Sequence, residues 1–145
     1  MFSSKNKAAS RHYDTLISKK TEIMGDVKFS GGLQVEGVIK GNLIAEPDSG
    51  AVVRISDSAR VEGQINAPNV VVNGTVIGDV YATDYIELGK RARIEGNVFY
   101  NLMEMVLGAE VNGKLLHRAK DELKQENASQ QDVDAINDQS GDKVD

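Results

Sequence analysis

Residues 58–65 read SARVEGQI, and residues 91–98, which begin 33 positions later, read RARIEGNV. Each stretch contains a five-residue unit in which a central glycine has an aliphatic residue two positions away on either side. The unit occurs six times, at residues 23–27, 35–39, 61–65, 72–76, 94–98 and 111–115. Self-similarity of this kind indicates a repeat architecture, so the fold is predicted to arise by stacking equivalent segments.

Apolar residues and glycines alternate with other residues well beyond each unit. One series is Leu33, Val35, Gly37, Ile39, Gly41, Leu43 and Ala45, and another is Val70, Val72, Gly74, Val76, Gly78, Val80 and Ala82. Alternation of this length, with many β-branched residues, is typical of strands with one buried face. The outer face should carry the polar residues Glu36, Glu62, Asn73, Glu95 and Asn112. We expect the glycines to lie inward, where a Cβ would crowd the axis of the fold.

The spacing of the glycines predicts the shape of the stack. Successive unit glycines are 12, 26, 11, 22 and 17 residues apart, and four of these values are near multiples of about 5.6. The value of 26 includes the turn-rich sequence EPDSG at residues 46–50, an insertion of about four residues. The prediction is an all-β, three-sided parallel β-helix (solenoid) of about six windings, with about 17 residues per turn. The two opening phrases should therefore lie two coils apart on one wall.

The main alternative for an all-β chain of this size is a β-sandwich built from hairpins. That architecture requires paired turn signals about every 8–12 residues, and it gives no reason for a phrase repeated six times. The solenoid is therefore the favoured interpretation.

The composition restricts the class of protein further. The chain has 145 residues, of which 40% are hydrophobic, with three Phe, four Tyr and no Trp, so Val, Ile and Leu must supply the core. The absence of cysteine excludes disulfides and thiolate metal sites. No run of about 18 apolar residues predicts a membrane span, and the N-terminus lacks the apolar core of a secretory signal. The net charge of −5 argues against a nucleic-acid partner.

Three segments are predicted along the chain. Residues 1–14 form a flexible basic tail, residues 15–117 the β-solenoid domain, and residues 118–145 a disordered acidic tail. The acidic tail has too few apolar side chains to offset the entropy lost on ordering. At its start, Leu116, Ala119 and Leu123 have the spacing of one short amphipathic helix. This segment is either a cap on the last coil or the frayed beginning of the tail.

Self-association follows from the predicted architecture. The first and last coils of a solenoid expose unpaired backbone groups and aliphatic side chains, and monomeric repeat proteins cover such ends with caps. The contacts expected at the N-terminal end come from Leu16, Ile17, Ile23, Val27 and Phe29. Those expected at the C-terminal end come from Met103, Met105, Leu107, Val111 and Leu115. Each of these side chains has an ordinary core position as its alternative.

The repeats resemble those of the bactofilins, a family of bacterial cytoskeletal proteins. The resemblance rests on TLISKKTEIMGDVKFSGGLQVEGVIKGNL (residues 15–43), ISDSARVEGQINAPNVVVNGTVIGDV (55–80) and IELGKRARIEGNV (86–98). It implies a right-handed β-helix that polymerises end to end without nucleotide, as a non-polar filament. It also implies a cytoplasmic scaffold at the inner face of the membrane, with cell-wall-modifying enzymes as partners. The sequence NLMEMVLGAEVNGKLL (101–116) departs from the expected pattern, because Leu and Met replace bulky aromatic residues.

The first residues suggest a membrane contact. Met1 and Phe2 are followed by Lys5 and Lys7, and bactofilins that bind membranes begin similarly. Each contact is weak, since a basic residue near an anionic surface contributes about 1 kcal/mol. Many copies along one filament would strengthen binding by avidity. The alternative is a disordered segment without a target.

An enzyme or ligand-binding solenoid is the alternative function. Hexapeptide-repeat acyltransferases use strict six-residue units and usually a catalytic histidine. In this chain the spacing varies, and the two histidines, His12 and His117, are expected in or beside the tails. The sequence predicts no catalytic residue, no cofactor and no metal site.

Overall fold

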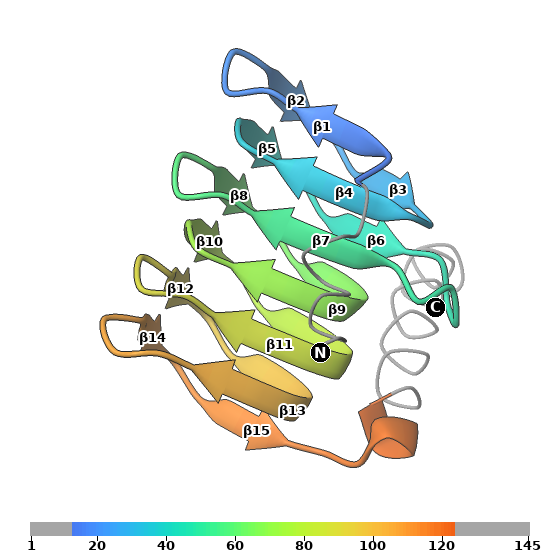
Figure 1. Ribbon diagram of the computed structural model, residues 1–145, viewed down its shortest axis with the longest axis vertical. Helices are drawn as coiled ribbons and strands as arrows, with labels where there is room; N and C mark the ends of the chain where they lie inside the picture. The colour runs from blue at the N-terminus through green and yellow to red at the C-terminus, as the bar shows by residue number, and fades with distance from the viewer. Residues whose placement is uncertain (1–12, 124–145) are drawn as a thin grey trace, which may run out of the picture.

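The computed structural model describes residues 13–123, which form one stack of coils (Figure 1). All strand pairs within these residues are parallel. In Figure 1 the front strands run toward the left, and the chain then passes behind them and descends, so the coil is right-handed. The predicted β-solenoid of about six windings is confirmed, and the parallel pairing excludes a hairpin-built sandwich.

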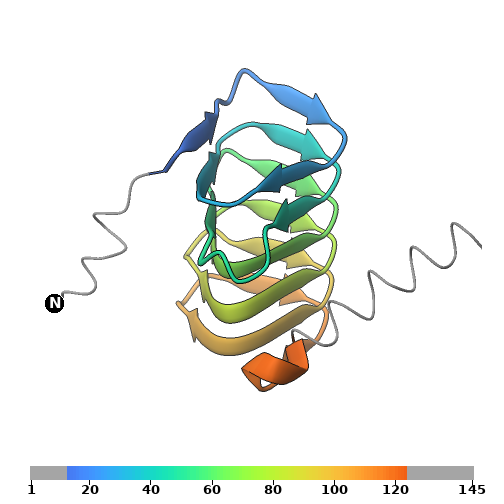
Figure 2. The same cartoon turned by 90° about the vertical axis from the view of Figure 1, so that its right-hand side faces the viewer.

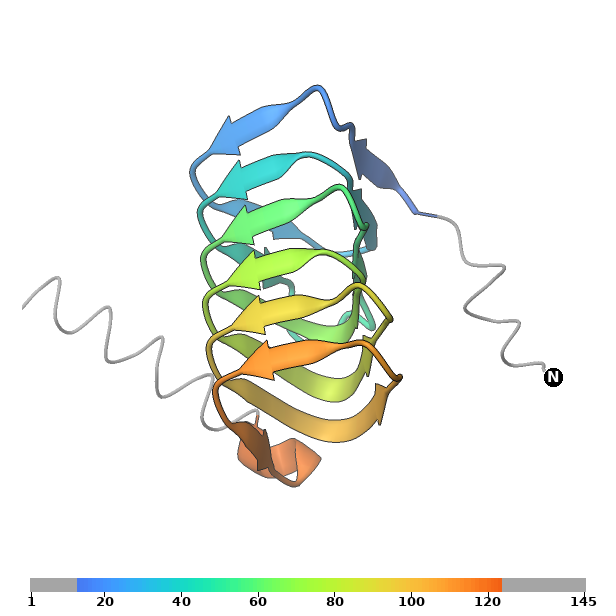
Figure 3. The same ribbon diagram turned by 90° about the vertical axis from the view of Figure 1, so that its left-hand side faces the viewer.

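Each coil passes through three walls, which we call B, A and C in chain order. Wall A consists of β2 (Glu22–Met24), β5 (Val38–Lys40), β8 (Arg60–Glu62), β10 (Thr75–Ile77), β12 (Arg93–Glu95) and β14 (Glu110–Asn112). Wall B consists of β1 (Thr15–Ile17), β4 (Gly32–Val35), β7 (Val52–Ile55) and the second halves of β9 (Ile65–Val72), β11 (Val80–Leu88) and β13 (Val98–Met105). Wall C consists of β3 (Val27–Phe29), β6 (Leu43–Ala45), the first halves of β9, β11 and β13, and β15 (Leu115–His117). Figure 3 shows the strands of wall A stacked in order.

The register between coils places the two opening phrases as predicted. On wall A, Val61 pairs with Val76, and Val76 pairs with Ile94. The phrases therefore lie two coils apart on the same wall. The loop between β6 and β7 contains the EPDSG insertion, and it lengthens that coil without disturbing the pairing of Ile39 with Val61 on wall A.

The core is a set of aliphatic columns that run along the axis of the rod. One column on wall A is Ile23, Ile39, Val61, Val76, Ile94 and Val111. One column on wall C is Val27, Leu43, Ile65, Val80, Val98 and Leu115. We number the coils 1 to 6 from the N-terminal end. The column members in coils 2 to 5 are fully buried, whereas those in coils 1 and 6 are not. The alternation in the sequence thus correctly predicts the inward face.

Three strands are longer than the sequence suggested. β9, β11 and β13 continue around the corner between walls C and B, where the others stop (Figure 2). In these three strands the corner contains no glycine, and β11 has one extra residue there, between Ala82 and Tyr85, relative to both neighbours. The glycine spacing could not reveal this corner, because extended chain continues through it.

The role of the glycines differs from the expected one. At the corner between walls A and C, a Cβ on Gly63 would collide with the backbone carbonyl oxygen of Gly41 in the preceding coil, not with side chains on the axis. Gly96 has the same relation to Gly78, and its φ of 153° also disfavours a side chain. Glycine is therefore required because adjacent coils approach backbone to backbone at this corner.

Asparagine and aspartate beside these glycines link the coils. The side-chain oxygen of Asp26 accepts a hydrogen bond from the backbone N–H of Asn42 at 2.9 Å, and that of Asn42 accepts one from Gln64 at 2.8 Å. Asp79 and Asn97 repeat this contact further along the rod, toward Asn97 and Lys114 respectively. These bonds satisfy corner N–H groups that the turn would otherwise leave unpaired.

Replacing Gly63 with alanine tests the backbone approach. The added methyl group must displace the carbonyl of Gly41, so the free energy of unfolding should fall by about 1–3 kcal/mol. Circular dichroism during guanidinium denaturation measures the change. Gly50→Asn is the control, because no atom lies within 4 Å of its Cβ position and asparagine tolerates the φ of 70° there. Equal effects of both substitutions would contradict this role of Gly63.

Candidate functional site: the two ends of the rod

Each end of the rod presents three strands that are paired on one side only. At the N-terminal end these are β1, β2 and β3, which pair with β4, β5 and β6. At the C-terminal end they are β14, β15 and the second half of β13. Unpaired strand edges are templates for pairing with another chain, so both ends have the geometry of association surfaces.

The aliphatic columns reach the N-terminal end without being covered there. Ile23, Val27 and Phe29 face inward and are half-buried, whereas the residues below them in coil 2 are buried. Two of the predicted contacts behave differently. Ile17 is buried within the core, and Leu16 projects from the outer side of wall B beside Gln34, with 58% of its surface exposed.

At the C-terminal end, Met103, Met105, Val111 and Leu115 continue the inward columns of walls B, A and C. Met103 and Val111 are half-buried, and Leu115 is 43% exposed. The residues that precede them in the columns, such as Ile86 and Ile94, are fully buried. The last coil therefore has an apolar inner surface that lacks the neighbour every other coil has.

Leu107 occupies a different position from the other predicted contacts at this end. It lies in the tight turn between β13 and β14 and is 94% exposed. Its side chain extends from the corner between walls B and A, outside the columns. Because this leucine is so exposed, contact with another surface would remove a large apolar area from water, which is favourable.

Sequence reasoning missed three exposed apolar residues near the ends, namely Met24, Leu102 and Val106. Met24 is 77% exposed on the outer side of wall A. The sequence did indicate that Met24 faces outward, because the second residue of the other five units is Glu or Asn. Leu102 and Val106 belong to the apolar run before β14, where the sequence gives no separate indication of which residues face outward.

The segment after β15 is ordered as far as the structure describes it. Residues 120–123 form a helical turn beyond the last coil (Figures 2 and 3), and Leu123 is fully buried. The expected helix is thus present with Leu123 but without Leu116, which lies in β15. Of the predicted tails, residues 1–12 and 124–145 lie outside the described residues, and so do Met1, Phe2, Lys5, Lys7 and His12.

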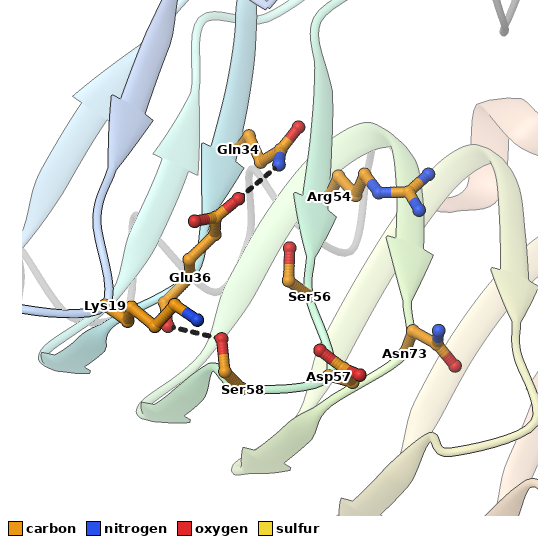
Figure 4. A pocket seen from close by; sticks show the side chains of 8 residues that line it. All are labelled: Lys19, Gln34, Glu36, Arg54, Ser56, Asp57, Ser58 and Asn73. Carbon is orange, nitrogen blue, oxygen red and sulfur yellow. Dashed lines mark hydrogen bonds between the residues drawn. The ribbon is translucent and has the colours of Figure 1, made fainter.

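Within residues 13–123, a depression of about 300 Å³ on the side of the rod is a candidate for a ligand site (Figure 4). It lies where wall B meets the turns toward wall A, and its lining is polar. The lining residues are Lys19, Gln34, Glu36, Arg54, Ser56, Asp57, Ser58 and Asn73. Gln34 donates to the Glu36 carboxylate at 2.7 Å, and the Ser58 hydroxyl donates to the Glu36 carbonyl at 2.9 Å. This lining contains neither histidine nor cysteine.

Three further observations concern residues 13–123. His117 packs edge-on against Tyr100, with ring centroids 5.6 Å apart. No group of three or more His, Cys, Asp or Glu side chains within this range has the geometry to hold a metal ion. No helix in the same range is long and apolar enough to cross a membrane.

Comparison with known proteins agrees with this geometry. Residues 15–116 match the family described as bactofilin, polymer-forming cytoskeletal. The chain belongs to the bactofilin family. Two relatives from Myxococcus xanthus, Bactofilin BacP and Bactofilin BacO, are each 26% identical to it, over 116 and 102 residues.

The extent of these matches differs between the two relatives. The alignment with BacP covers 79% of this chain but 47% of BacP, so the chain spans about half the length of that relative. The alignment with BacO covers 70% of this chain and 78% of BacO. No solved structure matches significantly. Membership of the bactofilins thus confirms the resemblance found in the repeats.

The side of the bactofilin rod carries one strongly perturbed group. The Tyr85 hydroxyl on wall B donates to the Glu104 carboxylate at 2.9 Å and lies 3.5 Å from that of Glu87. Desolvation raises the pKa of Tyr85, and the two carboxylates raise it further because a phenolate beside them would be repelled. These contacts link coils 5 and 6 through the outer surface.

The raised pKa of Tyr85 predicts a pH dependence at alkaline pH. The folded chain holds this proton more tightly than the unfolded chain, so the stabilisation is complete below about pH 10 and is lost as the pH rises above it. Tyr85→Phe should make stability less sensitive to pH between about 10 and 12. Thermal unfolding across this range measures the effect, and Tyr100→Phe is the control. Parallel curves for the wild type and Tyr85→Phe would contradict the assignment.

Proposed function

We propose that this bactofilin assembles end to end into filaments without nucleotide. The proposal extends to filaments at the inner face of the cytoplasmic membrane that organise cell-shape or cell-envelope machinery. The observation that supports assembly is the condition of the two ends. There, strand edges and aliphatic columns stop with Ile23, Val27, Val111 and Leu115 only partly covered.

Stacking one rod on another would extend both features that hold each rod together. The backbone edges could pair as adjacent coils do, and the apolar columns would become continuous. Burying about 500 Å² of apolar surface per junction contributes about 12 kcal/mol, against an association cost of about 4–15 kcal/mol. The gain and the cost are of similar size, so one charged substitution at a junction should shorten the filaments.

The family resemblance favours joints between like ends, N-terminal to N-terminal and C-terminal to C-terminal. Each such joint has two-fold symmetry, and alternating joints of the two kinds give a filament without polarity. Two different apolar end surfaces, one built from Ile23, Val27 and Phe29 and the other from Met105, Val111 and Leu115, are consistent with this arrangement.

Arginine at the C-terminal end tests the proposed junction. Leu107→Arg and Leu115→Arg should each give a folded protein that sediments as a shorter species, because the junction would have to bury an unpaired charge. Ile77→Arg is the control, since Ile77 faces outward on wall A between Glu62 and Glu95 and far from both ends. Filaments of unchanged length in both end variants, seen by sedimentation and electron microscopy, would count against these positions.

Membrane attachment is proposed to use Met1, Phe2, Lys5 and Lys7. The support is their combination of an apolar start with basic residues. Because each copy binds weakly, attachment should require assembled filaments. The proposed filament therefore acts as a multivalent surface, on which cell-wall-modifying enzymes are the expected partners.

Deleting residues 2–7 tests the membrane contact. Co-sedimentation with vesicles of phosphatidylglycerol and phosphatidylethanolamine should fall to the level seen with phosphatidylcholine vesicles, while filaments remain visible by electron microscopy. Arg60→Gln removes one positive charge from the middle of the rod, where no effect on assembly is expected, and serves as the control. Undiminished binding to the anionic vesicles after the deletion would remove the proposal.

The competing function is a small solenoid enzyme or ligand-binding protein. Its support is the polar depression around Glu36, Arg54 and Asp57. Electron microscopy of the purified chain without nucleotide discriminates between the two. Filaments support the scaffold, whereas discrete trimers would favour an enzyme of the acyltransferase type.

A further inference from the structure

The path of the chain after coil 6 breaks the order of the walls. Every earlier passage along wall C is followed by a strand of wall B, so the segment after β15 would form a seventh strand there. The chain continues that path for one residue, because Arg118 N–H donates to the Tyr100 carbonyl at 2.9 Å. It then becomes a helical turn at residues 120–123, which lies beyond the last coil (Figures 2 and 3).

The helical turn is held by its own contacts. Leu123 N–H donates to the Ala119 carbonyl at 3.0 Å, and the Glu122 carboxylate accepts from the Ala119 N–H at 2.9 Å. This second bond is the acidic half of a capping box and fixes where the helix begins. Leu123 has none of its surface exposed.

Two further contacts anchor the turn to the side of the rod. The Lys120 ammonium lies 3.0 Å from the carboxylate of Asp84, at the bend of β11 between walls C and B. At the same corner of the next coil, which is nearer to the helical turn, the Asn101 amide donates to the Arg118 carbonyl at 3.1 Å. The anchor thus runs from beyond coil 6 to the corner that begins coil 5.

A helix in this position cannot serve as a strand for a neighbouring molecule. Its backbone is coiled rather than extended, and Leu123 N–H donates within the turn to Ala119, so it offers no ladder to continue wall B. The described residues of the N-terminal end have no equivalent. There, the N–H of Asp14 donates to the Gly32 carbonyl, its carboxylate accepts from the Gly32 N–H, and the chain runs directly into β1.

We propose that residues 119–123 act as a gate over the wall B side of the C-terminal end. The gate rests on the proposed end-to-end assembly and adds an order to it. N-terminal ends join first, because their edges are open. C-terminal ends join only after the helical turn is displaced, so the Asp84–Lys120 pair and the burial of Leu123 set the concentration at which filaments form.

Three variants of the full chain test the gate. Lys120→Gln removes the ion pair and should lower the concentration needed for filaments by about threefold, as expected for an exposed pair. Leu123→Ser removes the buried contact and should lower it by about tenfold. The exchange of charges in Asp84→Lys with Lys120→Asp should restore the wild-type value. Arg60→Gln is the control, because it breaks an ion pair of similar exposure, Arg60–Glu62, in the middle of the rod.

The measurements are pelleting over a concentration series, electron microscopy, and circular dichroism to confirm that each variant is folded. Easier assembly of Lys120→Gln and Leu123→Ser, with no change in Arg60→Gln, supports the gate. If the wild type forms filaments and the gate variants form them at the same or a higher concentration, the gate is wrong while end-to-end assembly stands. If no variant assembles at any concentration, the proposed function fails and the gate fails with it.

Discussion

The parallel backbone ladder between successive coils is the interaction on which the whole structure depends. Each strand of the rod pairs with its equivalent in the coils before and after it, so the hydrogen bonds run along the axis. Such a ladder has no natural end, because the last coil presents the same donors and acceptors as every coil before it. Stability within the molecule and the proposed adhesion between molecules therefore have the same geometric basis.

Side chains adapt to this ladder in two ways. Inside, equivalent positions form aliphatic columns, in which residues such as Ile39 and Val61 each pack against a neighbour of the same kind. At the corner between walls A and C, the coils approach so closely that only glycine fits, and an adjacent Asn or Asp bonds to the next coil. The repeated aliphatic–glycine unit thus meets two requirements: its aliphatic residues fill the interior, and its glycine leaves the corner without a Cβ.

The two ends differ although they arise from the same repeat. Within residues 13–123, no segment lies over the edges of the first coil, whereas a helical turn lies beyond the last coil and Lys120 ties it to Asp84. The filaments proposed for this chain form without nucleotide, so their assembly would have to be controlled by other means. Competition between an intramolecular and an intermolecular contact at one end is a simple one. The exposed Leu107 and Leu115 show that the turn covers only part of that end.

The sequence by itself determined the class of fold, the number of coils, the inward residues and the family, because each depends on a periodicity that one chain displays. It also predicted that Ile23, Val27, Val111 and Leu115 would end the columns, since they belong to the first and last units. Only the tertiary structure decided what depends on contacts between coils. In the structure Ile17 is buried, Leu16 faces outward, and the corner glycines contact backbone. After the last coil the chain forms a helical turn in which Leu123 is buried. These outcomes depend on register and on side-chain packing across about 17 residues, which spacing along the chain does not encode.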